Sequence, residues 1–284
     1  MQSVQGAAQD TFSPYLVLVA VLFMFAQALQ MWSGAARLAG VRTRRVATGL
    51  TLFNLFATTG RLLALVYMLF IGSLADHARA SHDPHLFEGE MRVVMLAAAV
   101  GAVLGGALLP SATRLLQRGI QSFERTGTLV GSLARLGRPA VMISAFGEFV
   151  APTPSMLRHS PATLPKAFLW WNIVVMAFWV TGPLAAYDAG VLVPAYFGTA
   201  VAASGLITGV ATITLTLIVD PTAALITDQA AHGLRPESDV KAMLIYIVIT
   251  AFVGMLLAQL LLHPAALVIA AVAQFLNSHG VHHG

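Results

Sequence analysis

Six stretches of this sequence are long and apolar enough to cross a lipid bilayer as helices. They span about 14–34, 46–71, 92–110, 167–187, 193–219 and 242–262. Charged residues make up only 10% of the chain, which is too few to cover a water-soluble surface. Because hydrocarbon offers no hydrogen bonds to an exposed backbone, spanning segments have to be helices or closed barrels. The sequence therefore predicts an all-α integral membrane protein, with residues 1–284 forming a single polytopic membrane domain.

Several classes of protein are excluded by what the sequence lacks. The chain has no cysteine, so disulfides, thiol catalysis and cysteine-based metal sites are absent. It contains no GxxxxGK[ST] loop for ATP. The net charge of +4 belongs to the loops of a membrane protein and does not indicate nucleic acid. We predict no cofactor and no metal, and we treat the terminal HGVHHG as inert.

Lysine and arginine gather in alternate loops. Of the 16 such residues, all but Arg61, Arg79 and Arg92 lie in the loops after the first, third and fifth spans. The positive-inside rule places those three loops in the cytoplasm and both termini outside. The first ten residues contain no lysine or arginine, unlike a cleaved signal peptide, so the first span is expected to remain in the chain.

The loop after the third span is predicted to be a cytoplasmic amphipathic segment, at about 111–166. Residues 111–125 place Leu116, Ile120 and Phe123 on one helical face. Residues 139–150 are also mostly apolar but include Glu148. We expect interfacial helices on the cytoplasmic leaflet, which a re-entrant hairpin could accompany, and the alternative is a simple solvated loop.

Two smaller features bear on packing. Residues 264–275 are too few for a span and are expected to form a short C-terminal interfacial or re-entrant helix. GxxxG pairs occur in the third and fifth spans, where they would let helices approach closely: Gly101 with Gly105, and Gly205 with Gly209.

Arg61 lies deep within the second span. It follows Val46 by fifteen residues and precedes Ile71 by ten, so it is roughly 15–22 Å from either boundary. An arginine side chain is too short to reach water from that depth. Steps of three and four residues along the same helix face give a row that is polar except for Ala47: Arg44, Ala47, Thr51, Asn54, Thr58 and Arg61.

A charged residue inside the membrane indicates a functional site by default. The structural alternative is an ion pair between two helices, with Glu148 or Asp188 as the partner of Arg61. The six predicted spans contain no acidic residue, so we favour an anion brought by the substrate. A phosphate matches the fork of donors on a guanidinium. We predict that Arg61, Thr51, Asn54 and Thr58 bind substrate.

The arginines at the cytoplasmic mouth of this row are further candidates. Arg37, Arg42 and Arg44 would capture a phosphate there, although orientation in the membrane and attraction to anionic lipid would also explain them. Three acidic residues are candidates for coupling or for an ion pair: Glu148, Asp220 and Asp228. The alternatives are a solvated loop carboxylate for Glu148 and a helix end at Asp220–Pro221.

Three stretches resemble the Amj family of alternative bacterial lipid II flippases. They are RLAGVRTRRVATGLTLFN (37–54), IVDPTAALITDQAAHG (218–233) and LLAQLLLHPAA (256–266). The resemblance covers nearly the whole chain, and RLAGVRT followed by LFN is its most specific part. It implies a protein of the bacterial cytoplasmic membrane that moves lipid II, the undecaprenyl-pyrophosphate-linked peptidoglycan precursor, to the outer leaflet. It also implies functional overlap with the MurJ flippase, and no functional residues can be carried over from it.

A lipid pyrophosphate has an anionic head and an apolar tail, so its transport needs a polar, cationic groove beside lipid. The row ending at Arg61 would form one wall of this groove. The protein would move the head group through the groove by alternating access. Two other classes remain open: a transporter of another anionic lipid or small anion, and a membrane enzyme acting on polyprenyl phosphates. We predict that the chain is not an enzyme, because no paired carboxylates or clustered histidine and aspartate appear at one end of a span.

Overall fold

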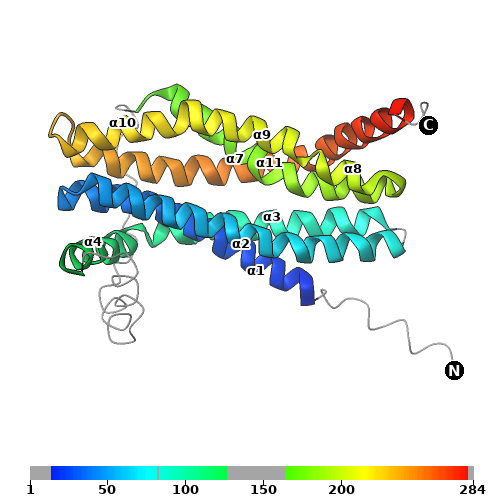
Figure 1. Cartoon of the computed structure of the whole chain (residues 1–284), viewed down its shortest axis with the longest axis horizontal. Helices are drawn as coiled ribbons and strands as arrows, with labels where there is room; N and C mark the ends of the chain where they lie inside the picture. Colours follow the sequence, from blue (N-terminus) through cyan, green and yellow to red (C-terminus); the bar gives the residue numbers. More distant parts are fainter. Residues whose placement is uncertain (1–13, 82, 127–163, 281–284) are drawn as a thin grey trace.

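The computed structural model describes residues 14–81, 83–126 and 164–280, and the regular elements of these residues are all helical. Figure 1 shows the long helices lying side by side along the longest axis of the molecule. Six helical runs are long and apolar enough to cross a membrane. The predicted all-α membrane fold is therefore confirmed. In chain order the elements are α1 (Pro14–Thr43), α2 (Val46–Ser81), α3 (Pro84–Ala107), α4 (Leu109–Thr126), α7 (Lys166–Leu192), η3 (Pro194–Tyr196), α8 (Phe197–Ala202), α9 (Ser204–Thr214), η4 (Leu215–Val219), α10 (Asp220–Ala231) and α11 (Glu237–Gly280).

Several helices are longer than the apolar stretches suggested. The helix α2 continues to Ser81, and α3 begins at Pro84 behind an Asp83 cap whose side chain accepts a hydrogen bond from the Leu86 amide. Arg79 and Arg92 therefore lie within helices and not in a loop. These longer helices include acidic residues that lie just outside the predicted spans, among them Asp76, Glu88 and Asp188.

Residues 264–275 do not form a separate short helix. They continue α11, which runs unbroken from Glu237 to Gly280 and contains Pro264. Proline removes one backbone hydrogen bond and bends a helix, and α11 bends along its length in Figure 1. The sequence prediction made this helix too short because His263 and Pro264 interrupt the apolar stretch.

The two GxxxG pairs behave differently. A β-carbon at Gly101 would collide with the Met24 carbonyl, and one at Gly105 would come within 2.7 Å of Ala28, so α3 packs closely on α1 through this pair. At Gly205 and Gly209, no atom of the described residues lies within 4 Å of such a β-carbon, so the packing role predicted for them is wrong.

The segment after α3 starts as predicted. The helix α4 is amphipathic, and Leu116 and Ile120 are buried in the same apolar cluster as residues of α1. The rest of the predicted interfacial segment, including residues 139–150 with Glu148, lies outside the described residues.

The fifth span is a broken helix. The segments η3 and α8 precede α9, and the π-helix η4 then joins α9 to α10. The Asp220 amide donates to the Leu215 carbonyl, five residues back, directly before Pro221. A π-helical turn accommodates one residue more than an α-helical turn does, and such turns recur at functional positions. Asp220–Pro221 thus does not end the helix, which continues to Ala231.

The bundle has two distinct ends in Figure 1. The turn between α1 and α2, helix α4 and the turn between α10 and α11 lie at one end, here called the arginine-rich end. The start of α1, the turn between α2 and α3 and the end of α11 lie at the other, here called the terminal end.

Candidate functional site

A central cavity lies between α1, α2, α7, α11 and the η4–α10 segment. Its volume is about 150 Å³, the space of roughly five water molecules at about 30 Å³ each. The structure brings together in it five of the residues singled out by the sequence: Arg37, Asn54, Thr58, Arg61 and Asp220. Two arginines and several hydrogen-bonding side chains thus share one pocket inside a membrane bundle.

Arg61 projects from the middle of α2 and lines two cavities. Within the described residues its guanidinium makes no hydrogen bond and no ion pair. Asp188, one of its expected partners, lies instead beside Glu88 and His263, and Glu148 is outside the described residues. Arg61 therefore remains available to an anion.

Arg37 is buried and clamps three helices together. Its Nη2 donates to Asp220 Oδ1 at 2.9 Å, and its guanidinium lies 4.1 Å from the centre of the Phe53 ring. Its Nε and Nη1 have no hydrogen-bond partner among the described residues. A buried donor without an acceptor is costly, so Arg37 also presents two donor groups that an anion would satisfy.

The other predicted binding residues do not line this cavity. Arg42 pairs with Glu237 at 2.9 Å and ties α1 to α11 at the arginine-rich end. Arg44 occupies the tight turn between α1 and α2 with φ of 56°. Thr51 donates its hydroxyl to the Ala47 carbonyl, and Asp228 lies 3.5 Å from the His232 ring.

Two further cavities extend the central one along α2. The second, of about 110 Å³, shares Arg61 and Gln30 with the first. The third, of about 380 Å³, shares Tyr67 and Trp179 with the second. These shared walls make a chain of three cavities, here called the cavity chain, between α2 and the α7–α9 side of the bundle.

Several polar residues of the cavity chain are not among the candidates predicted from the sequence. Gln27 and Gln30 come from α1, and Asn172 comes from α7. Asn172 also donates to Thr250 Oγ1 at 2.7 Å and so ties α7 to α11. The available signal was an amide side chain inside an apolar stretch, which needs a partner in the bundle just as a charge does.

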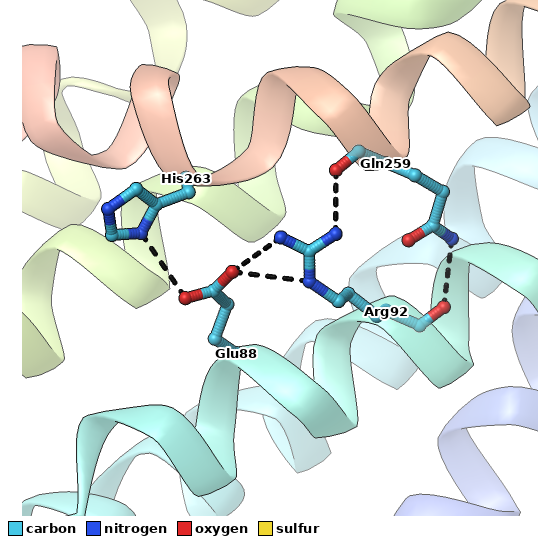
Figure 2. Close-up of polar contacts among 4 residues, drawn as sticks. All are labelled: Glu88, Arg92, Gln259 and His263. Carbon is cyan, nitrogen blue, oxygen red and sulfur yellow. Dashed lines mark hydrogen bonds and ion pairs between the residues drawn. The ribbon is translucent and has the colours of Figure 1, made fainter.

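A second polar cluster was invisible in the sequence because three helices contribute to it. Glu88 Oε1 accepts from Arg92 Nη2 at 2.5 Å, and Arg92 also donates to the Gln259 carbonyl at 2.9 Å (Figure 2). The Glu88 Oε2 atom faces His263 Nδ1 at 3.2 Å. Asp188 of α7 completes a group in which one ligand atom from each of Glu88, Asp188 and His263 lies within 4.8 Å of the others. Among the described residues, this group is the one placed to share a metal ion.

The comparisons with known proteins agree on one family. Residues 22–273 match the family model Amj, described as alternate to MurJ. The chain is 32% identical to the lipid II flippase Amj of Bacillus subtilis (strain 168) over 263 residues, which cover 90% of this chain and 97% of that protein. That relative is named for transport and not for catalysis, in agreement with the prediction that this chain is not an enzyme. No solved structure matches the chain significantly. With a family model that covers most of its length and a full-length relative at this identity, the chain belongs to the Amj family.

Proposed function

We propose that this protein is a lipid II flippase of the bacterial cytoplasmic membrane. The observation that carries the proposal is the central cavity, where Arg37 and Arg61 both offer guanidinium donors that no described residue satisfies. A pyrophosphate has the charge and the acceptor oxygens to bridge two guanidiniums. The name of the Bacillus subtilis relative supplies the substrate class.

The cavity chain supports a route for the head group. Its polar residues include Asn54, Thr58 and Arg61 of α2 and Gln30 of α1, and the three on α2 are also exposed at the surface of the bundle. Apolar side chains of α2, among them Leu62 and Leu69, are exposed beside this polar row, and Leu65 lines the third cavity. The pyrophosphate would pass through the cavity chain while the polyprenyl tail stays in lipid beside α2.

The size of the central cavity argues for alternating access. A volume of about 150 Å³ suits a phosphate group but is too small for the whole disaccharide–pentapeptide. The helices therefore have to separate for the head group to enter. The Arg37–Asp220 contact between α1 and α10 is a suitable gate, because a phosphate would replace the Asp220 carboxylate on the same guanidinium.

The direction of transport follows from the orientation we propose for the bundle. The arginine-rich end faces the cytoplasm and the terminal end faces outward. Outward movement of an anion is then favoured by an inside-negative potential, by roughly 2.3 kcal/mol per charge per 100 mV. The arginines at the cytoplasmic end, Arg42 and Arg44, would concentrate the anionic head group there.

The test measures lipid II exposure on the outer leaflet of cells depleted of their resident flippase. Wild type, Arg61→Ala and Arg61→Lys are compared at matched membrane levels. We expect wild type to restore exposure, Arg61→Ala to abolish it and Arg61→Lys to be intermediate, because lysine keeps the charge but loses the fork of donors. Arg79→Ala is the matched control, since Arg79 pairs with Asp76 near the terminal end, away from the cavity chain.

The outcomes separate the proposal from its alternatives. If Arg61→Ala restores exposure as well as wild type does, Arg61 does not serve the substrate. If wild type fails while the protein is present in the membrane, another anionic lipid or a small anion, which the central cavity accommodates, becomes the favoured substrate. Chemical change of the lipid during the assay would identify an enzyme instead.

A further inference from the structure

The cluster of Glu88, Asp188 and His263 has no role in the proposed passage of pyrophosphate. It lies apart from the cavity chain, since none of its members lines those cavities. Glu88 is the fifth residue of α3, and Asp188 lies four residues before the end of α7. His263 follows Glu237 by 26 residues, or about 39 Å of helix, which exceeds the roughly 30 Å hydrocarbon core. The cluster is therefore near the membrane surface at the terminal end.

Asp188 is the member that most needs an explanation. Its side chain is 1% exposed, and its Oδ2 has no hydrogen-bond partner among the described residues. The charged groups that act on it are Glu88 and Arg92 from α3 and His263 from α11. A buried carboxylate without a partner is strongly unfavourable unless a proton or a bound metal ion neutralises it.

The remaining members are held ready to share such a cation. Arg92 occupies Glu88 Oε1, which leaves Oε2 facing His263 Nδ1 at 3.2 Å without a well-formed hydrogen bond. Arg92 and Gln259 in turn exchange side-chain and backbone hydrogen bonds, which fixes the Glu88 carboxylate between α3 and α11 (Figure 2). Carboxylate ligands of metal ions are commonly oriented by an outer layer of hydrogen bonds of this kind.

We infer that Glu88, Asp188 and His263 form a binding site for a divalent first-row transition-metal ion such as Zn²⁺. One imidazole and two carboxylates balance the charge of a divalent ion and match the ligands that Zn²⁺ takes. Ligand atoms in a tetrahedral zinc site, at about 2.1 Å from the metal, lie about 3.4 Å apart. The Glu88–His263 separation of 3.2 Å is close to this value, and a ligand atom of Asp188 lies within 4.8 Å of both. The His263 ring is 44% exposed, which leaves a position for water.

The test measures Zn²⁺ binding to the purified full chain in detergent by titration calorimetry and by metal content after dialysis. Every sample lacks a polyhistidine tag and carries His279, His282 and His283 replaced by alanine, so that the histidine-rich end of the sequence does not bind the probe. We expect one Zn²⁺ per chain that excess Mg²⁺ does not displace. His263→Ala and Asp188→Asn should each weaken binding by more than about tenfold.

His232→Ala is the matched control, because His232 also lies beside an aspartate, Asp228, but at the arginine-rich end. Its Zn²⁺ affinity should equal that of the parent protein. His263→Ala keeps the test decisive even where Asp188→Asn does not fold, since the His263 ring is partly exposed. A parent protein that binds no Zn²⁺, or a His263→Ala variant that binds it unchanged, would overturn the assignment. The measurement involves no lipid II, so its result is independent of the proposed flippase activity.

Discussion

At the scale of single residues, the two partners of the cavity ion pair differ in their surroundings. The Arg37 side chain is 6% exposed, whereas that of Asp220 is 43% exposed. Removing Asp220 leaves a buried guanidinium that keeps its full cost of desolvation. Removing Arg37 leaves a carboxylate that water can reach. The pair is therefore asymmetric, and Arg37 depends on an anionic partner more than Asp220 depends on Arg37.

We predict that Asp220→Ala lowers the free energy of unfolding by about 1–3 kcal/mol, because it orphans a buried charged donor. Arg37→Met should cost less, and the double variant should be more stable than Asp220→Ala alone. Thermal unfolding in detergent measures all three. Inorganic pyrophosphate should raise the Tm of Asp220→Ala more than that of wild type, since the anion would take the vacated place on Arg37. Equal shifts in the two proteins would contradict a phosphate site at Arg37.

At the scale of helices, the GxxxG motif packs closely against a neighbouring helix in α3 but not in α9. The GxxxG pair of α3 faces the backbone of α1, while the pair of α9 faces open space, and Gly205 lines the largest cavity of the cavity chain. The helix α9 continues into the π-segment η4, so this broken run is less tightly packed than α1 and α3. Loose packing at the cavity chain and tight packing behind it would suit a bundle that opens on one side.

We predict that Gly101→Ala destabilises the protein by roughly 1–3 kcal/mol, because its β-carbon would force α1 and α3 apart. Gly209→Ala should leave stability unchanged or raise it slightly, because alanine favours the helix by about 1 kcal/mol and meets no neighbour. Thermal unfolding of the two variants in parallel compares them. Similar losses in both would mean that α9 packs as tightly as α3.

At the scale of the whole molecule, the two ends of the bundle carry different chemistry. The arginine-rich end holds Arg42 and Arg44, and the terminal end holds the Glu88–Asp188–His263 cluster. The proposed direction of transport and the side of the membrane on which the proposed metal site lies both depend on which end faces the cytoplasm. The lysine and arginine content of the loops favours the arginine-rich end as the one that faces the cytoplasm.

The orientation is directly testable because the chain contains no cysteine. We predict that Ser81→Cys, at the end of α2 beside the turn to α3, reacts with a membrane-impermeant maleimide in intact spheroplasts. Leu234→Cys, 78% exposed in the turn between α10 and α11, should react only after the membrane is opened. Labelling of each after permeabilisation controls for accessibility. The reverse pattern would invert the topology and the proposed direction of transport.

The sequence by itself determined the fold class, because twenty or so apolar residues in a row leave the backbone no spanning conformation but a helix. It also determined the polar face of α2. Asn54, Thr58 and Arg61 line the central cavity together because helical periodicity is a local property of the chain. Helix lengths were harder to predict, since α2, α3 and α11 extend past their apolar stretches with charged and polar residues that neighbouring helices hold in place.

Only the tertiary structure decided which distant residues meet. Arg37 and Asp220 are 183 positions apart, and Glu88, Asp188 and His263 come from three helices, so no local pattern indicates their contacts. The structure also distinguished two identical GxxxG motifs by what lies opposite each one. Spacing along a helix fixes the face on which a side chain lies, but packing of whole helices chooses its partner, and that choice depends on the shape of every surface in the bundle.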